Sequence, residues 1–223
     1  MSEETWSAVD NYLCHQLLPH DAALEATLSA STAAGLPEIH VSPTQGKFLH
    51  LLARMHGARR ILELGTLAGY SAIWLARALP PDGRLVTLEY DPKHAEVARA
   101  NFVRAGVDGL VDLRVGPALE TLPILAAEKG GPFDLIFIDA DKESYAEYFK
   151  WALRLSRRGT VIIADNIIRK GAVIEPMHSD SRVQGVRRFL DVMATEPRVT
   201  ATAIQTVGSK GYDGLAFALV LAD

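Results

Sequence analysis

Polar side chains follow two apolar runs of the sequence, at the points where those runs end. Leu135–Ile138 is followed by Asp139-Ala140-Asp141-Lys142, and Val161–Ala164 is followed by Asp165-Asn166. Oxygen ligands that meet at neighbouring strand ends suit a hard cation, Mg²⁺ first, with Ca²⁺ or Mn²⁺ as alternatives. A single Asp at a strand end is usually explained as a helix cap. Capping explains too little of Asp139, Asp165 and Asn166 together, so we expect a metal site.

Lys142 stands directly beside this cluster and has two interpretations. It could be a simple ion-pair partner of the neighbouring carboxylates. It could also be a base, because a nearby cation lowers the pKa of an amine. The residues alone leave both open.

A glycine loop, Glu63-Leu-Gly-Thr-Leu-Ala-Gly-Tyr-Ser71, follows the first apolar run. Gly65 would let the backbone turn tightly and approach a ligand, and Gly69 would let the next helix pack closely against the strand. The N-terminus of that helix would offer N–H groups to a polar or anionic group. By itself the loop could serve several cofactors, or could be an ordinary tight turn.

Glu89 ends the second apolar run, twenty residues beyond Gly69. An acidic side chain at this position is placed to accept both hydroxyls of a ribose. A helix-start carboxylate is the alternative, but Asp91 already fills that role. The loop and Glu89 together predict a cofactor that contains adenosine.

Predicted strands and helices alternate along the chain, and they must position these residues. The apolar runs are the expected strands, and between them lie helical segments at about 70–79, 92–105, 117–128 and 143–155. This alternation predicts an α/β fold with a doubly wound parallel sheet. Ligands of such sheets bind beyond the carboxyl ends of the strands. A helix at about 182–195 and two strands joined by a short link, hence antiparallel, complete the pattern. The strands are expected at Ile61–Leu64, Leu85–Leu88, Val111–Val115, Leu135–Ile138, Val161–Ala164, Thr200–Gln205 and Leu215–Leu221.

The N-terminal part is expected to be helical. Ser42 and Pro43 start one helix, with Gln45 completing a capping box. We expect one domain over 1–223, made of N-terminal helices at 1–57 and an α/β core at 58–223. Cys14 is expected to be a small buried hydrophobe. On the first helix, the apolar side chains that share one face are Trp6, Val9, Leu13 and Leu17. On the later helix, the expected buried side chains are Phe48, Leu49, Leu52 and Met55.

The composition is that of an ordinary globular protein. Hydrophobic residues make up 48% of the 223 residues, charged residues make up 22%, and the net charge is −4. The negative balance gives no general attraction for nucleic acid. One cysteine excludes an intrachain disulfide, and the seven histidines show no metal-ligand spacing. The first 45 residues contain six acidic residues and no Lys or Arg, unlike a targeting segment, so a cytoplasmic location is expected.

These motifs resemble the metal-dependent class I O-methyltransferases that use S-adenosylmethionine (SAM), which include catechol and caffeoyl-coenzyme A O-methyltransferases. The small bacterial branch is the most similar, from about Val41 to the end of the chain. Asp-Ala-Asp-Lys together with Asp-Asn is the specific part of the match. The matching stretches are 63–71, Glu89-Tyr-Asp-Pro92, Gly116-Pro-Ala-Leu119, 139–142 and Ala164-Asp-Asn166.

The resemblance implies a Rossmann-like fold with a seven-stranded, mostly parallel sheet whose last strand is antiparallel. It implies methylation of a small catechol-like acceptor, metal ligands Asp139, Asp165 and Asn166, Lys142 as general base, and a homodimer. We include Gly69 and Asp139 among the cofactor-binding candidates. The SAM contacts that it implies are Val41, Glu63, Gly65, Thr66, Ser71, Glu89, Ala118 and Asp141.

One position departs from the family pattern. Where plant caffeoyl-coenzyme A enzymes carry a substrate-contacting Asn, this chain has Lys170, so substrate specificity does not carry over. Arg169 and Lys170 are either a solvated charge pair or groups that attract an acidic substrate. The stretch from Gly171 to Arg182 is expected to be a loop near the site mouth.

Three other functions would explain part of the sequence. A methyltransferase acting on a hydroxylated uridine of tRNA would use the same chemistry, but the net charge counts against it. A nicotinamide-dependent dehydrogenase would explain the glycine loop and Glu89, but not Asp139, Asp165 and Asn166. A protein that only binds adenosine compounds is disfavoured, because every expected ligand position carries a competent residue.

Overall fold

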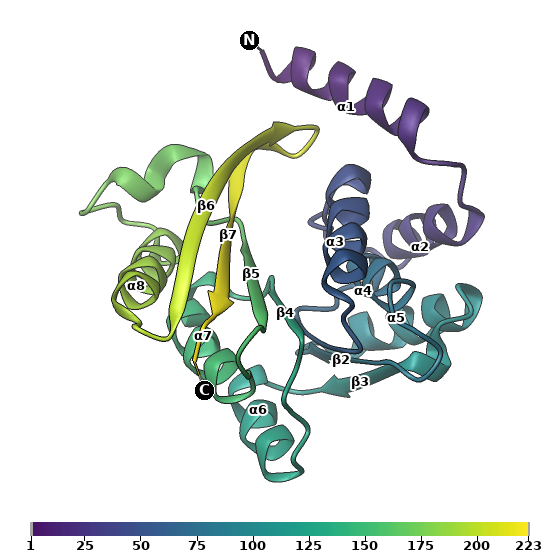
Figure 1. Cartoon of the computed structure of the whole chain (residues 1–223). Coiled ribbons are helices and arrows are strands. Elements are labelled where there is room, and N and C mark those ends of the chain that lie inside the picture. The colour runs from purple at the N-terminus through teal and green to yellow at the C-terminus, as the bar shows by residue number, and fades with distance from the viewer. Residues whose placement is uncertain (1, 223) are drawn as a thin grey trace.

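A computed structural model describes residues 2–222 of the chain. In this part of the chain, seven strands form one sheet in the order β3-β2-β1-β4-β5-β7-β6 (Figure 1). The pairs among β1 to β5 are parallel, whereas β7 is antiparallel to both β5 and β6. This topology confirms the predicted fold class. The strands are β1 (Arg60–Leu64), β2 (Arg84–Glu89), β3 (Val111–Val115), β4 (Leu135–Ile138), β5 (Val161–Asp165), β6 (Val199–Gly208) and β7 (Gly211–Val220).

Helices cover both faces of the sheet (Figure 1). The α-helices are α1 (Glu3–Leu17), α2 (Ala22–Ala33), α3 (Pro43–His56), α4 (Tyr70–Ala76), α5 (Pro92–Arg104), α6 (Ala118–Ala127), α7 (Tyr145–Arg154) and α8 (Ser181–Thr195), and short 3₁₀ turns span Asp108–Leu110, Lys142–Ser144 and Arg169–Ile174. The helix expected at 70–79 ends earlier, at Ala76. The N–H of Ala78 bonds to the carbonyl of Leu75, a tighter turn that leads into Pro80.

Two hydrophobic cores lie on opposite faces of the sheet, because successive strand residues point to opposite sides. Ile61 packs in one core with Leu49 of α3 and the apolar residues of α4. Its neighbour Leu62 packs in the other core, with Phe149 of α7 and Phe189 of α8. With both faces covered, the carboxyl ends of the parallel strands are left for binding a ligand.

The first helix is only partly covered by the rest of the chain. No residue of α1 is buried; Val9 is 50% exposed and Leu17 is 70% exposed. Cys14 is half-buried, so its expected full burial is wrong. The physical reason is the position of α1 at the outside of the molecule, where it contacts β6 and α3 rather than the sheet core.

The third helix starts as predicted but differs at two side chains. Ser42 accepts a hydrogen bond from the N–H of Gln45 at 3.2 Å, which confirms the cap. The Gln45 side chain does not complete a capping box, because its amide donates to Asp165 instead. Met55 is 74% exposed near the end of the helix, whereas Leu49 is fully buried. The prediction that Met55 belongs to the buried face of this helix is therefore wrong.

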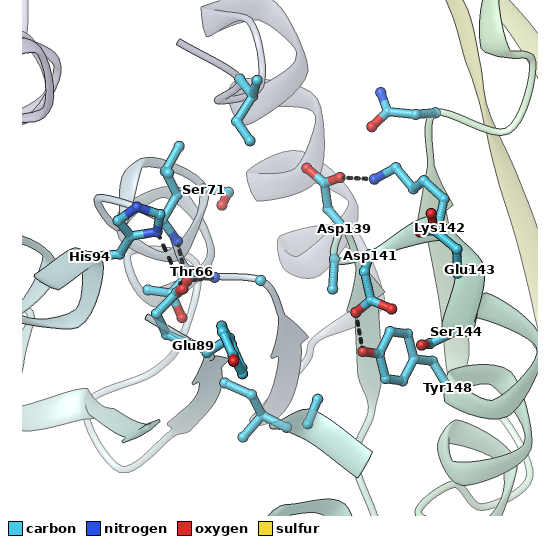
Figure 2. Close-up of a pocket in the computed structure, with 18 of the residues that line it drawn as sticks. Thr66, Ser71, Glu89, His94, Asp139, Asp141, Lys142, Glu143, Ser144 and Tyr148 are labelled. Carbon is cyan, nitrogen blue, oxygen red and sulfur yellow. Dashed lines mark hydrogen bonds and ion pairs between the residues drawn. The ribbon is translucent and has the colours of Figure 1, made fainter. Parts of the chain in front are cut away.

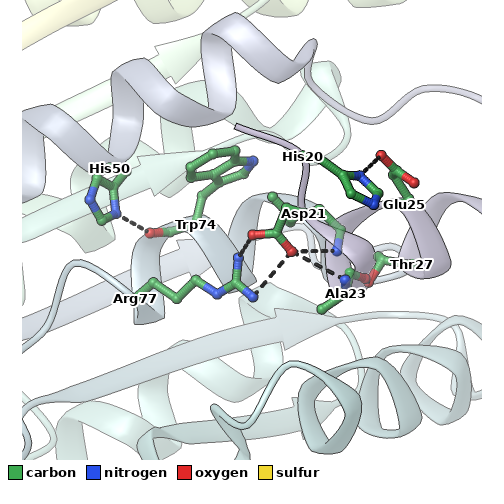
Figure 3. A network of polar contacts seen from close by, with 9 residues as sticks. His20, Asp21, Ala23, Glu25, Thr27, His50, Trp74 and Arg77 are labelled. Atoms are coloured by element: carbon green, nitrogen blue, oxygen red, sulfur yellow. Dashed lines mark hydrogen bonds and ion pairs between the residues drawn. The ribbon is translucent and has the colours of Figure 1, made fainter. Parts of the chain in front are cut away.

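Polar contacts fix the N-terminal helices to α4 (Figure 3). Asp21 caps α2 by accepting the N–H groups of Ala23 and Leu24, and it also pairs with Arg77 just after α4. His50 of α3 lies 3.1 Å from the carbonyl oxygen of Trp74 in α4. The connection between α2 and α3 carries Val41, which lines the cavity at the carboxyl ends of the strands. The boundary proposed at 57–58 falls between α3 and β1.

Within residues 2–222, no helix is long and apolar enough to span a membrane.

Candidate active site

A cavity of about 880 Å³ lies at the carboxyl ends of β1, β2 and β4. Most of the residues predicted to bind the cofactor or the metal line it. Glu63, Gly69 and Asp165 do not line this cavity. The predicted residues in its wall are Val41, Gly65, Thr66, Ser71, Glu89, Ala118, Asp139, Asp141, Lys142 and Asn166.

The glycine loop comes directly after β1 and passes close to the end of β4. Gly65 has a φ of 98°, and a Cβ there would lie 2.1 Å from the carbonyl oxygen of Asp139. Gly69 has a φ of 86°, and a Cβ there would lie 2.5 Å from the Phe102 ring of α5. Close packing therefore explains both glycines. Gly69 serves the contact between α4 and α5 rather than the cavity wall.

Glu89 is held by the backbone of that same loop. Its Oε2 accepts the N–H groups of Thr66 at 3.1 Å and Leu67 at 2.8 Å, and its Oε1 accepts the N–H of Asp91 at 2.9 Å. His94 Nδ1 lies 3.4 Å from Oε1 (Figure 2). The N–H groups of Thr66 and Leu67 in the loop thus fix Glu89 in the cavity wall.

Glu63 lies behind the wall and is fully buried. Its Oε2 accepts a hydrogen bond from the Thr87 hydroxyl at 2.6 Å, and that hydroxyl lies 2.6 Å from Thr66 Oγ1. Its Oε1 is buried without a hydrogen-bond partner among the described residues. Burial raises the pKa of the Glu63 carboxyl to about 8, although the Thr87 bond acts in the opposite direction.

Asp139 and Lys142 face one another across the cavity wall (Figure 2). Lys142 Nζ lies 2.7 Å from Asp139 Oδ1 and 4.9 Å from the centre of the Tyr145 ring. Lys142 is only 8% exposed, so its ammonium group is held at this position. The hydroxyl of Tyr145 lies 3.2 Å from the carbonyl oxygen of Ile138 and 3.0 Å from that of Asp165. Tyr145 therefore ties the ends of β4 and β5 together.

Asp165 is buried at the end of β5, beside Asn166. Its Oδ2 accepts a hydrogen bond from Gln45 Nε2 at 2.6 Å, and its Oδ1 accepts one from the N–H of Asn166 at 2.6 Å. Burial raises the pKa of the Asp165 carboxyl to about 7, and the negative charge of Asp139 adds to the rise. In residues 2–222, no three His, Cys, Asp or Glu side chains form a metal cluster; the expected set has Asn166 as its third member.

Asp141 follows β4, three residues beyond its end, and is held by Tyr148 of α7. The Tyr148 hydroxyl donates a hydrogen bond to Asp141 Oδ1 (Figure 2). Burial, followed by this bond, raises the pKa of the Tyr148 phenol.

Sequence reasoning missed Gln45, His94 and Tyr148 as functional residues. His94 and Tyr148 line the cavity, and Gln45 contacts a proposed metal ligand. Tyr148 stands seven residues after Asp141, a spacing that could place both on one side of the turn into α7. Gln45 carried no comparable signal, because its partner is 120 residues away.

Comparison with known proteins decides the family. The model of the O-methyltransferase family matches residues 19–219. The chain belongs to this family. It is similar to a catechol O-methyltransferase of Niastella koreensis, with 54% identity over 99% of this chain and 100% of the relative. A catechol O-methyltransferase of Mycobacterium tuberculosis is 58% identical, over 95% of this chain and 94% of the relative.

Solved structures of methyltransferases share the fold. An O-methyltransferase from Bacillus cereus in complex with SAH is 57% identical, with a TM-score of 0.97 over 98% of this chain and all of that one. TomG from Streptomyces achromogenes, in complex with SAM, is 53% identical, with a TM-score of 0.96 over the full length of both chains. This chain is therefore a SAM-dependent O-methyltransferase, and the dehydrogenase alternative is wrong.

Proposed function

We propose that this methyltransferase acts on one hydroxyl of a small catechol-like acceptor and requires a divalent cation. The observation that carries the proposal is the shared wall of Asp139, Lys142 and Asn166, with Asp165 directly behind it. Two relatives at more than half identity are named catechol O-methyltransferases, which supports the acceptor class. Two adjacent hydroxyls are the feature that lets a catechol chelate a cation.

The donor set fits a hard cation. Asp139, Asp165 and Asn166 offer carboxylate and carboxamide oxygens, the ligands that Mg²⁺, Ca²⁺ and Mn²⁺ prefer. A bound cation would supply positive charge that stabilises an aryloxide. The contacts of Asp165 with Gln45 and Asn166 orient its carboxylate, as the outer partners of metal ligands do.

Lys142 is proposed as the general base. Its Nζ lies beside Asp139 in the wall of the cavity, where it would take the proton of the acceptor hydroxyl. The acceptor oxygen then bonds to the methyl carbon of SAM while the carbon–sulfur bond breaks, and SAH leaves. Because the side chain is buried and held by Asp139 and Tyr145, Lys142 keeps a fixed position toward the acceptor.

The predicted SAM contacts are proposed on the same geometry. Glu89 is placed to accept the ribose hydroxyls, and its three backbone hydrogen bonds fix its carboxylate. Gly65 brings the loop backbone close to the ligand. Gly69 and Glu63 would act from behind the wall, Gly69 by packing α4 and Glu63 by holding Thr66 through Thr87. The other proposed contacts are Val41, Thr66, Ser71, Ala118, Asp139 and Asp141.

A methylation assay tests the reaction and the metal together. Purified protein is incubated with SAM and either catechol or caffeic acid, with Mg²⁺ or with EDTA, and products are measured by mass spectrometry. Methylated product that forms with Mg²⁺ and is lost with EDTA is the expected result. Absence of product on these acceptors, with SAM binding confirmed by calorimetry, would contradict the catechol proposal and direct the assay to hydroxylated tRNA.

Asp165→Ala provides the matched variant for the metal. It removes a proposed metal ligand that does not line the cofactor cavity, so SAM affinity should persist while activity is abolished. Asp191→Ala, at an exposed position of α8, is the control and should keep wild-type activity. Full activity in Asp165→Ala would contradict the metal site.

We also propose a homodimer built on the outer face of α1 and β6. Val9, Tyr12 and Leu17 of α1 are exposed, and so is Ile204 of β6. Asp10 of α1 accepts the N–H of Ser209 at 2.7 Å, which places the helix beside the β6–β7 turn. Exposed apolar groups on two neighbouring elements are a feature of interaction surfaces. Light scattering after size exclusion should give twice the chain mass, and Leu17→Glu should shift it to the monomer.

A further inference from the structure

A second cavity, of about 670 Å³, adjoins the proposed active site. The two cavities share Arg169 and Arg182 as wall residues. Arg182 already has a partner, because its Nε and Nη2 donate to Asp180 at 3.0 and 2.7 Å. This pairing, with a smaller contribution from the nearby charge of Arg169, lowers the pKa of Asp180 to about 2. The charges of Arg182 and Asp180 therefore neutralise one another.

Within residues 2–222, no carboxylate forms an ion pair with the Arg169 side chain. Its Nε is buried, and no described residue accepts a hydrogen bond from it. The carboxylates nearby serve other groups, since Asp180 holds Arg182 and Asp213 accepts the main-chain N–H groups of Ile168 and Arg169 at 2.9 and 3.0 Å. A third carboxylate on the second cavity, that of Glu175, belongs to an exposed residue. A buried donor without a partner is unfavourable, and an anionic ligand would satisfy it.

The backbone that carries Arg169 is strained. Asn166, Arg169 and Lys170 have φ angles of 57°, 54° and 55°, in the left-handed region that side chains other than glycine rarely adopt. Such backbone conformations are unfavourable and persist where surrounding contacts hold them, as Asp213 does here. This conformation puts Arg169 in the wall of the cavity that Asn166 and Lys142 also line.

We propose that Arg169 binds a carboxylate carried on the ring of the acceptor, so that the enzyme prefers acidic catechols to neutral ones. This inference rests on the proposed function, because the ring hydroxyls must lie at Asp139 and Asn166 in the same cavity. A guanidinium pairs with a carboxylate through parallel hydrogen bonds, which fixes the orientation of the ring as well as its charge. Lys170 is exposed and lines the second cavity but not the first, so it is a solvated group.

The experiment compares two acceptors that differ by one carboxylate, 3,4-dihydroxybenzoate and catechol. The quantity measured is the ratio of their kcat/KM values with Mg²⁺ and SAM. Arg169→Gln should lower this ratio at least tenfold, and Arg169→Lys should restore part of it. Lys170→Gln, one residue away in the same backbone conformation, should keep the wild-type ratio. The ratio does not depend on the fraction of folded protein.

Equilibrium binding gives a second readout. Calorimetry is run with SAH and Mg²⁺ present. Compared with the wild type, Arg169→Gln should have a tenfold higher Kd for 3,4-dihydroxybenzoate and a nearly unchanged Kd for catechol. Equal losses for both acceptors, or an unchanged ratio, would overturn the role of Arg169 while leaving the catechol reaction intact. If the wild-type protein methylates neither acceptor, the proposed function itself fails.

Discussion

The side-chain amide of Gln45 donates a hydrogen bond to Oδ2 of Asp165 across 2.6 Å, although 120 residues separate the two. The other oxygen, Oδ1, accepts the N–H of Asn166 at 2.6 Å. The carboxylate is therefore fixed from two sides, one of them the N-terminal helix α3. Through this contact the N-terminal helices take part in forming the proposed metal site.

Removing this contact should weaken the metal site without removing a ligand. In Gln45→Ala, the Mg²⁺ concentration needed for half-maximal methylation should rise about 10- to 100-fold, the range for outer partners of metal ligands. The Kd for SAM, measured by calorimetry, should stay near wild type. Gln16→Ala, at an exposed position of α1, is the control. An unchanged Mg²⁺ requirement in Gln45→Ala would argue against Asp165 as a ligand.

Glu89 tests the proposed cofactor site. Glu89→Gln removes the negative charge that holds the N–H groups of Thr66, Leu67 and Asp91 and that would accept the ribose hydroxyls. Hydrogen bonds to charged groups contribute about 1.5–3 kcal/mol, so the Kd for SAM should rise at least tenfold. Glu96→Gln, exposed on α5, should bind SAM as the wild type does. Equal affinities in the two variants would exclude Glu89 from the cofactor site.

The order of strands and helices could be predicted from the sequence because each apolar run is local and turn residues separate the runs. Positions decided by distant partners could not. β6 extends over Val199–Gly208 rather than 200–205, because all ten of its residues pair with β7. The polar and apolar residues of β6 do not mark its ends. The apolar face of α1 likewise predicted a helix, but not that the face lies outside the core.

The site residues likewise include some that the sequence predicts and others that only the folded structure reveals. Residues that follow strand ends, such as Asp139 and Glu89, could be found because parallel strands bring their carboxyl ends to one edge. Gln45 and Tyr148 act through side-chain contacts that only the packing of α3 and α7 creates. Arg169 was visible as a charge, but its unpartnered Nε and its strained backbone were not.

Tyr148 should position Asp141 toward the cofactor. In Tyr148→Phe, Asp141 loses the hydrogen bond from the phenol, so the KM for SAM should rise about three- to tenfold while kcat changes less. Steady-state kinetics at saturating catechol and Mg²⁺ separate the two constants. Tyr12→Phe, exposed on α1, is the matched control. A fall in kcat with an unchanged KM for SAM would instead place Tyr148 in the chemical step.

Glu63 makes the stability of the ligand-free protein depend on pH. Burial raises its pKa from 4.5 to about 8, so the fold favours the protonated carboxyl. The resulting penalty on folding is absent below the unfolded pKa, grows as the pH rises from about 4.5 to 8, and is constant above that. Full burial makes it on the order of a few kcal/mol at pH 8.

Glu63→Gln cannot ionise, so it removes this penalty and leaves a pH-independent cost for an unmatched amide. Relative to wild type, the Tm of the variant should therefore rise between pH 5 and pH 8, by roughly 5 °C or more. Thermal melts by circular dichroism across this range measure the difference in Tm. Ionisation of Asp165 changes the Tm of both proteins equally, so it cancels from this difference. A difference in Tm that stays constant from pH 5 to 8 would show that Glu63 ionises as readily in the folded chain as in the unfolded one.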